Sequence, residues 1–128
     1  MTKRILIVED NDLNLKLFRD VLSANRYDVI ETKDGNLAVE MTKTQSPDLI
    51  LMDIQLPEIS GLDVIRMIKQ DSSIAHIPII AVTAFAMKDD EERILRAGCE
   101  AYLSKPISID QLTATIAQLI EEAEGANA

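Results

Sequence analysis

Four short apolar runs of this sequence lead directly onto charged or hydroxyl side chains. The residues at their ends are Glu9 with Asp10, then Asp53, Thr83 and Lys105. Runs of four or five apolar residues are typical of strands buried on both faces of a parallel sheet, and the carboxyl ends of such strands form the binding crevice. We therefore expect three carboxylates, one hydroxyl and one ammonium to meet in one pocket, which is the composition of a divalent-cation and phosphoryl site.

The residue types in this pocket suit magnesium-assisted phosphoryl transfer. Mg²⁺ prefers oxygen ligands and commonly takes one or two carboxylates, so Asp10 and Asp53 are candidate ligands. Asp53, at the end of a rigid strand, is also the candidate nucleophile, because phosphoryl transfer depends on positioning and charge neutralisation. Lys105 is expected to contact one phosphoryl oxygen, and the Thr83 hydroxyl or a backbone N–H another. A cation, Lys105 or protonation must neutralise the crowded acids.

Strands and helices are predicted to alternate along the chain. Apolar or β-branched runs predict strands over 5–8, 27–32, 49–52, 79–82 and 101–104. Apolar residues at helical spacing predict helices over 12–25, 36–44 and 89–97, and two more that begin at Ser60 and Ser108. Asp12 is the predicted N-cap of the first helix, Asp34-Gly35 a break before the second, and Ser60 and Ser108 open capping boxes.

This order favours an α/β fold. Five βα repeats imply right-handed crossovers, and we predict a flavodoxin-like (βα)5 doubly wound sandwich with a five-stranded parallel sheet in the order 2-1-3-4-5. A dinucleotide-binding fold is disfavoured because no G-x-G-x-x-G occurs. The 128 residues suit one domain, which we place at 1–121, followed by a short polar tail at 122–128 and no output domain.

The composition narrows the classes of partner. A net charge of −9, from 22 acidic and 13 basic side chains, disfavours nucleic acid and anionic membranes and favours protein partners. The lone cysteine, Cys99, forms no intramolecular disulfide, and neither a secretory signal nor an apolar run of about 18 residues is present, so a cytoplasmic protein is expected. Cys99 is interpreted as a small buried residue and His76, the single histidine, as a solvated loop residue.

Taken together, these motifs resemble the receiver domains of two-component response regulators. The matching residues are Glu9-Asp10, Asp53 with Pro57 and Gly61, Thr83-Ala84, and Tyr102 three positions before Lys105-Pro106. The resemblance implies that a histidine kinase or phosphotransfer protein phosphorylates Asp53. It also implies that the protein is not an enzyme beyond catalysing its own Mg²⁺-dependent phosphorylation and dephosphorylation.

Further site residues follow from this resemblance alone. Mg²⁺, or Mn²⁺ in its place, would be held by Glu9, Asp10, Asp53 and the Gln55 carbonyl. The phosphoryl group would be bound by Thr83, Ala84 and Lys105, with Tyr102 following Thr83 inward as part of the switch. Gln55 and Phe85 would tune dephosphorylation, although packing in their loops explains both equally well. Pro106 would be cis, against the general frequency of X-Pro bonds, which favours trans.

Three segments, 48–62, 81–88 and 98–102, are similar to single-domain regulators of asymmetric division and polarity in alphaproteobacteria. This similarity implies a role in the cell cycle, cell division and polarity, exerted through phosphorylation-dependent contacts with sensor histidine kinases, phosphatases or kinase-like proteins. The protein would be a monomer or weak dimer, recruited to a cell pole by membrane-bound kinases.

Other functions remain open at this point. A chemotaxis-type or phosphorelay-shuttle receiver would carry the same motifs without a cell-cycle role. An aspartyl-phosphate phosphatase of the haloacid dehalogenase type needs a second acid two residues after its nucleophile, where Gln55 stands. A flavodoxin-like electron carrier needs a hydroxyl-rich loop after the first strand and aromatic rings around a flavin, and the chain has Glu9-Asp10-Asn11 there and only four aromatic residues.

Overall fold

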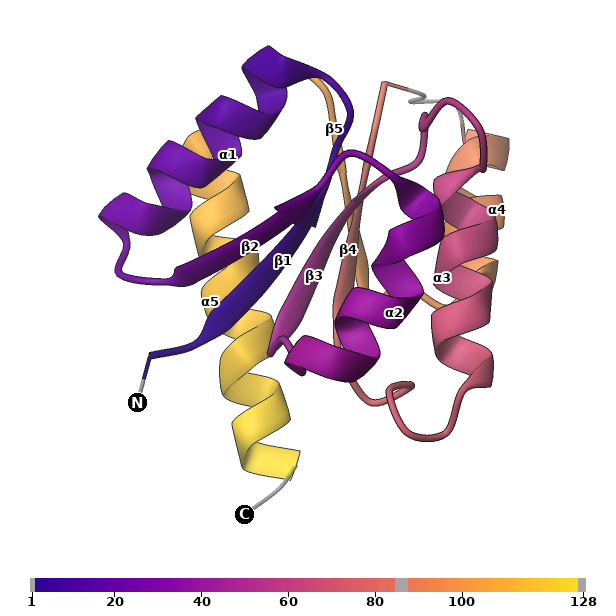
Figure 1. Ribbon diagram of the computed structural model, residues 1–128. Coiled ribbons are helices and arrows are strands. Elements are labelled where there is room, and N and C mark those ends of the chain that lie inside the picture. Colours follow the sequence, from indigo (N-terminus) through magenta and orange to yellow (C-terminus); the bar gives the residue numbers. More distant parts are fainter. Residues whose placement is uncertain (1, 85–87, 127–128) are drawn as a thin grey trace.

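The computed structural model describes residues 2–84 and 88–126, in which five strands alternate with five helices (Figure 1). The strands are β1 (Arg4–Val8), β2 (Asp28–Thr32), β3 (Leu49–Asp53), β4 (Ile79–Thr83) and β5 (Ala101–Ser104). The helices are α1 (Asp12–Ala24), α2 (Gly35–Gln45), α3 (Gly61–Gln70), α4 (Lys88–Arg96) and α5 (Ile109–Ala126). The predicted alternation is confirmed, with small differences at the ends of the elements.

All strand pairings are parallel, in the order β2-β1-β3-β4-β5, which confirms the predicted sheet. Every residue of β3 and β4 is buried, whereas the edge strand β2 contains no fully buried residue. This difference explains why the two central strands read as unbroken apolar runs, while β2 alternates and mixes in charged residues.

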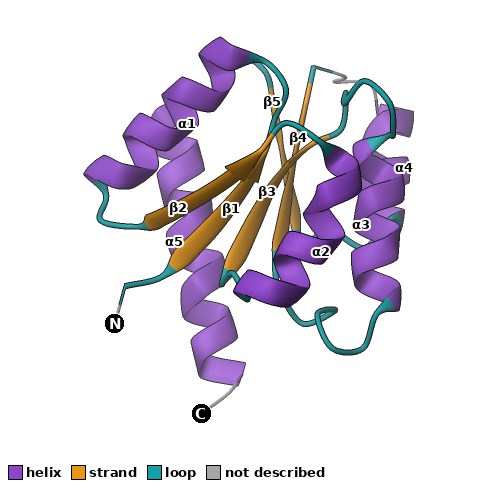
Figure 2. Ribbon diagram, in the orientation of Figure 1, coloured by secondary structure: helices purple, strands orange, loops and turns teal. Residues whose placement is uncertain are grey.

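Two helical layers enclose the sheet (Figure 2). Helices α1 and α5 cover one face, and α2, α3 and α4 cover the other. Successive strand residues point to opposite faces, so Ile5 joins Phe18 in one core cluster while Leu6 joins Ile65 in the other. Both clusters are largely aliphatic. Because the strands are parallel, their carboxyl ends lie together at one end of the sheet.

Two helix starts differ from the predictions. The N-cap of α1 is Asn11 rather than Asp12, because Asn11 keeps an extended backbone and its side-chain oxygen accepts from the Asn14 N–H at 3.0 Å. Asp34, predicted as part of a break, is the N-cap of α2 and accepts from the Asn36 N–H at 2.8 Å. Gly35 is the first residue of α2, and a Cβ there would lie 2.7 Å from Ile59 Cγ2 of the loop after β3, so a larger residue would displace that side chain.

The third helix begins as predicted, with a simpler cap. The Ser60 hydroxyl accepts from the Leu62 N–H at 3.2 Å, but the Asp63 carboxylate accepts from Arg66 and does not complete a capping box. At the other terminus, α5 continues to Ala126, so residues 122–126 of the expected tail are helical. An ion pair of 2.9 Å between Lys3 and Glu124 ties this last part to the start of the chain.

A mostly buried lysine connects three segments at the amino end of the sheet. Lys69 Nζ donates to the carbonyls of Ala75 and Ile77 at 3.0 and 2.8 Å and to Glu100 Oε1 at 2.6 Å. The other Glu100 oxygen accepts from the Ile79 N–H at 2.6 Å. We call this arrangement the Lys69 clasp. It joins α3, the loop before β4 and the segment between α4 and β5, which explains why a lysine is mostly buried here.

The loop between β3 and α3 passes very close to Gly61. Its N–H donates to the Ile54 carbonyl at 3.0 Å, and a Cβ on Gly61 would overlap the Asp53 carbonyl oxygen and lie 2.7 Å from Ile54 Cα. No larger residue fits without displacing the backbone that carries Asp53. The requirement for glycine here is therefore one of space.

We predict that Gly61→Ala lowers the free energy of unfolding by about 1–3 kcal/mol, because backbone must move to make room. Gly125→Ala is the matched control, since nothing lies within 4 Å of a Cβ there, and it should be neutral or stabilising by about 0.5–1 kcal/mol. Urea titrations followed by circular dichroism measure both changes. Equal stability of the two variants would contradict the steric argument.

Candidate functional site

The polar residues predicted to meet do lie at one edge of the sheet. Glu9 and Asp10 follow β1, Asp53 ends β3, and one carboxylate oxygen from each lies within 4.8 Å of the others. Lys105 follows β5, and its Nζ is 3.5 Å from Glu9 Oε1 and 3.7 Å from Asp53 Oδ2. Three acids and one ammonium therefore form a compact cluster, built by strands that are far apart in the sequence.

Backbone hydrogen bonds hold both the side chain of Asp53 and the residue that follows it. Its side chain is 3% exposed, and Oδ1 accepts from the Gln55 N–H at 2.9 Å. The next residue, Ile54, donates its N–H to the Val82 carbonyl at 3.0 Å and so continues the pairing of β3 with β4. Oδ2 faces Lys105 at 3.7 Å. The two oxygens thus have different surroundings, one held by backbone and the other beside a cation.

Glu9 is the most deeply buried of the three acids. It is 1% exposed; Oε2 accepts from the Asn11 N–H at 3.2 Å, whereas Oε1 is, in the described part of the chain, a buried oxygen without a hydrogen-bond partner. Burial, and next its interaction with Asp53, raise the pKa of Glu9 to about 7, while Asn11 and Lys105 act in the opposite direction. The site therefore favours a proton or a metal cation next to Glu9.

The donor set fits a hard divalent cation. Carboxylate oxygens are the ligands that Mg²⁺ prefers, and the three acids present such oxygens within 4.8 Å of one another. Glu9 Oε1 adds a further indication, since it is buried, accepts no hydrogen bond within the described residues, and has only the Lys105 ammonium, at 3.5 Å, to offset its charge. The Gln55 carbonyl as a further ligand stays a prediction.

Thr83, Ala84 and Lys105 lie on neighbouring chain segments at this edge. Thr83 is buried at the end of β4, and its carbonyl accepts from the Lys105 N–H at 2.7 Å. The Lys105-Pro106 bond is cis, so the expectation from the resemblance holds and the general frequency of trans bonds misleads here. The Ala84 N–H donates to Gln55 Oε1 at 3.1 Å, a contact that the sequence does not indicate because it depends on one side-chain rotamer.

Tyr102 and Phe85 complete the set of predicted residues. Tyr102 is half-buried on β5, and its interaction with Glu91 of α4 raises its pKa. This link to α4 has no signature in the sequence. Phe85 falls outside the described residues.

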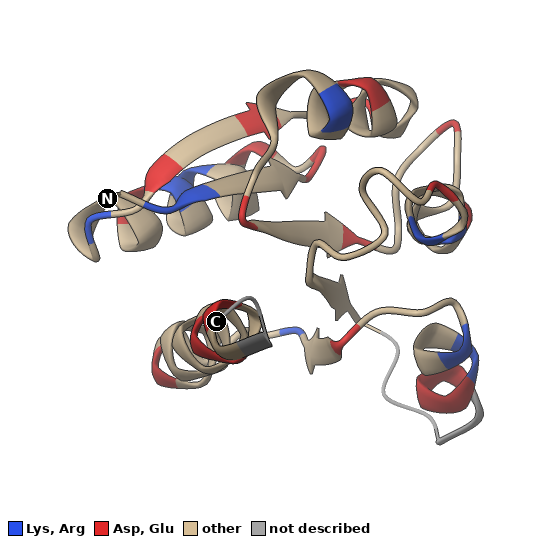
Figure 3. Ribbon diagram, turned by 90° about the horizontal axis from the view of Figure 1, so that it is seen from below, with Lys and Arg blue, Asp and Glu red and all other residues tan. Residues whose placement is uncertain are grey.

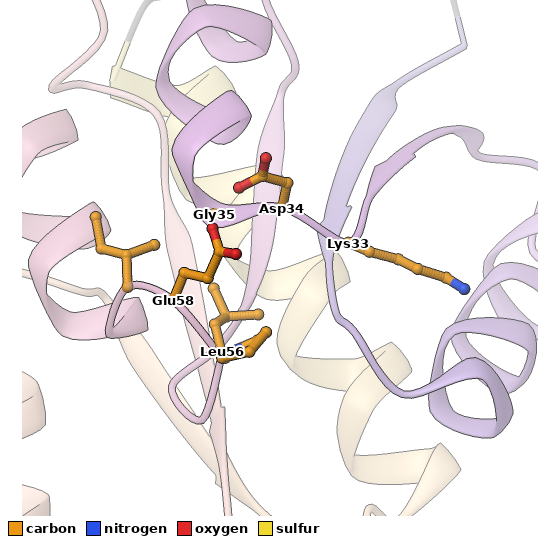
Figure 4. A pocket seen from close by; sticks show the side chains of 7 residues that line it. Lys33, Asp34, Gly35, Leu56 and Glu58 are labelled. Carbon is orange, nitrogen blue, oxygen red and sulfur yellow. The ribbon is translucent and has the colours of Figure 1, made fainter.

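Two cavities lie beside the acidic cluster but do not contain it. One of about 240 Å³ is lined by Lys33, Asp34, Gly35, Leu56, Pro57, Glu58 and Ile59. In Figure 4 the carboxylates of Asp34 and Glu58 lie near each other, whereas the Lys33 side chain extends away. The other, of about 470 Å³, is lined by Asn14, Leu17, Phe18, Lys105, Pro106 and Ile107. Lys105 is the residue that connects this second cavity to the acids.

Residues away from the site agree with their predicted roles. Cys99 is buried, its thiol donates to the Ile94 carbonyl at 3.3 Å, and burial raises its pKa to about 11, so it is not a reactive thiolate. His76 is exposed in the loop before β4. In Figure 3 the basic segments alternate with acidic and uncharged ones and form no continuous patch among the described residues in that view.

None of the described helices combines the length and the apolar character that crossing a membrane requires.

Comparisons with known proteins point in one direction. A family model described as the response regulator receiver domain matches residues 5–117. The polar-differentiation response regulator DivK of Brucella ovis is 56% identical over 96% of this chain and 100% of its own length. The receiver domain of a sensor histidine kinase from Pseudomonas aeruginosa, solved with a magnesium ion coordinated in its active-site cleft, is 36% identical with a TM-score of 0.87, covering 94% of this chain and 99% of that one. A CheY-like receiver domain protein from Methanospirillum hungatei has 26% identity and a TM-score of 0.91, over 98% and 99% of the two chains.

The raised pKa of Glu9 predicts a dependence of stability on pH in metal-free buffer. An unfolded glutamate ionises near pH 4.5 and Glu9 in the fold near 7, so the folded state holds the extra proton between these values and loses stability as the pH rises through this window. Glu9→Gln should remove about 3 kcal/mol of this decline, measured by urea unfolding at several pH values with a chelator present.

The matched control is Glu92→Gln, which changes an exposed glutamate on α4 and should keep the wild-type decline. An unchanged pH dependence in Glu9→Gln would show that Glu9 is ionised throughout the window.

Proposed function

Because the chain belongs to the response regulator receiver domain family, we propose that it is a signalling protein switched by phosphorylation of Asp53. The observation that carries this proposal is the position of Asp53, buried at the end of β3 with Lys105 Nζ 3.7 Å from its Oδ2. A carboxylate held in this way presents a nucleophilic oxygen beside a fixed cation. The phosphoryl donor would be a phosphohistidine of a sensor kinase or phosphotransfer protein.

The transfer replaces one phosphorus bond by another. Asp53 Oδ2 attacks the phosphorus, a P–O bond forms, and the P–N bond to the donor histidine breaks, so the imidazole nitrogen keeps the electron pair and takes up a proton. Lys105 is placed to meet the negative charge that builds up on one phosphoryl oxygen. The Thr83 hydroxyl and the Ala84 N–H, at the end of β4, would donate to others.

We further propose that Mg²⁺, or Mn²⁺ in its place, is held by Glu9, Asp10, Asp53 and the Gln55 carbonyl. When bound, the cation would neutralise the crowded carboxylates and one phosphoryl oxygen. The buried Glu9 oxygen that accepts no hydrogen bond within the described residues and the acid cluster support this, as does the magnesium ion in the Pseudomonas aeruginosa receiver domain. Lys105 cannot ligate a metal, so its role would be confined to the phosphoryl group.

The output is proposed to be a contact with another protein. Relatives at 55–56% identity are named polar-differentiation response regulators, which supports a role in cell-cycle and polarity control. The net charge of −9 favours protein partners such as sensor histidine kinases over nucleic acid or membrane surfaces. A cytoplasmic monomer or weak dimer, recruited to a cell pole by a kinase, would meet this role. Catalysis would be limited to the protein's own phosphorylation and dephosphorylation.

Tyr102 is proposed to report the phosphorylation state to that partner. It lies on β5, two strands away from β3, and its interaction with Glu91 links it to α4 rather than to Glu9, Asp10 and Asp53. A change at Thr83, which pairs with Ser104 across β4 and β5, could therefore reach Tyr102 and α4 without involving Asp53 directly. The contacts that differ between the two states would lie on this face.

Asp53→Ala should accept no phosphoryl group from a phosphorylated histidine kinase, whereas Asp20→Ala, which changes an exposed aspartate on α1, should be labelled like wild type. Removing Mg²⁺ with a chelator should also prevent labelling, because the acids are then uncompensated. Acid-labile, hydroxylamine-sensitive label from radioactive donor is the measurement. Such label on Asp53→Ala would refute the assigned nucleophile.

Tyr102→Phe should change the ratio of partner affinities between the phosphorylated and unphosphorylated protein by about two- to tenfold, as expected for the loss of one polar interaction of the hydroxyl. Labelling of Asp53 should stay close to wild type, since no described hydrogen bond joins Tyr102 to Glu9, Asp10 or Asp53. Tyr27→Phe, on the far side of the sheet at the start of β2, is the control and should leave the ratio unchanged. Loss of Asp53 labelling in Tyr102→Phe would place the ring in the phosphoryl site instead.

A further inference from the structure

Gln55 makes two contacts that join the ends of β3 and β4. Its backbone N–H donates to Asp53 Oδ1 at 2.9 Å, and its side-chain oxygen accepts from the Ala84 N–H at 3.1 Å. One residue therefore touches both the carboxylate at the end of one strand and the first backbone donor beyond the end of the next.

The Ala84 N–H is a donor placed for a group on Asp53. Ala84 follows Thr83, and β4 pairs directly with β3, where Val82 is opposite Asp53. Its N–H points towards the loop after β3, because its partner is a side chain of that loop. A phosphoryl group on Asp53 brings three further oxygens to this edge, and Lys105 is placed to meet one of them.

We propose that the Gln55 side chain is a displaceable latch, which occupies in the unphosphorylated protein the Ala84 N–H that a phosphoryl oxygen takes once Asp53 is phosphorylated. This inference rests on the proposed function. The amide oxygen of Gln55 stands in for a phosphoryl oxygen, so Gln55 competes with the phosphorylated state through Ala84. Gln55 is a positioning residue, since its side chain acts through the Ala84 backbone.

The exchange is favourable for physical reasons. A hydrogen bond from an N–H to an anionic oxygen is shorter and stronger than one to a neutral amide oxygen, so the phosphoryl group wins once it is present. The latch in turn gives the unphosphorylated loop a defined partner instead of water. Phosphorylation would release the Gln55 side chain, and the Ala84 N–H would then donate to a phosphoryl oxygen instead.

This role differs from shielding the acyl phosphate against water, the other role open to a side chain at this position. A shield changes the lifetime of the phosphoryl group but has no effect on Ala84 before phosphorylation. A latch changes the Ala84 amide in the unphosphorylated protein and the affinity for a phosphoryl mimic that water does not hydrolyse. The two roles are therefore separable by measurements that do not depend on dephosphorylation.

The test uses Gln55→Met, which keeps the length of the side chain and the backbone but removes the acceptor. Gln70→Met, at the exposed end of α3, is the matched control. At saturating Mg²⁺, Gln55→Met should bind beryllofluoride, a mimic of the phosphoryl group, about two- to tenfold more tightly than wild type, the range that one net hydrogen bond is worth. The ¹⁵N–¹H signal of Ala84 should move in metal-free, unphosphorylated Gln55→Met and not in Gln70→Met.

An Ala84 signal that stays in place, or a beryllofluoride affinity that is unchanged or weaker in Gln55→Met, would overturn the latch. These results leave Asp53 labelling in wild type intact, so they reject the latch alone. If wild type neither binds beryllofluoride nor accepts label at Asp53, the proposed function fails, and the latch fails with it.

Discussion

The structure depends on the crowding of like charges at one edge of the sheet. Glu9 and Asp53 are almost fully buried, with Asp10 within ligand distance, and Lys105 is the cation that approaches them. Buried carboxylates repel one another and lose hydration, so each needs a donor or a cation. The N–H groups of Asn11 and Gln55 donate to one oxygen of Glu9 and one of Asp53, and the other oxygen of each faces the Lys105 ammonium at 3.5 and 3.7 Å.

The parallel sheet is what makes such crowding affordable in free energy. Its central strands are buried along their whole length by two aliphatic layers, so the stability of the fold is generated away from the acids. Since all strands run in the same direction, the polar residues that follow their carboxyl ends all lie at the same end of the sheet. A fold of this kind concentrates its electrostatic cost where its chemistry takes place.

Much of this arrangement is predictable from the sequence, for identifiable reasons. Strands buried on both faces leave unbroken apolar runs, and the acid or hydroxyl that ends each run marks the site, which is why Asp53 and Thr83 stand out. The details that the sequence did not indicate are decided by tertiary contact. The loop after β3 leaves little space for a side chain at position 35, where Gly35 begins a helix, and the Gln55 side chain reaches Ala84 through a rotamer that no spacing rule describes. Helix α5 outlasts its apolar pattern, and an ion pair between Glu124 and Lys3 replaces burial near its end.

The Lys69 clasp holds the chain near the point where α4 ends. It fixes the segment just after α4, where Gly98 packs so closely on Lys69 that a Cβ would lie 3.0 Å from Lys69 Cγ. Towards the other end of α4, Glu91 interacts with Tyr102 of β5. The clasp also reaches α3 and the loop before β4, so the segment after α4 is tied to the amino end of the sheet through one ammonium group. Because the clasp lies at the opposite end of the strands from Glu9, Asp10 and Asp53, the two charged clusters are separated by the length of the buried sheet.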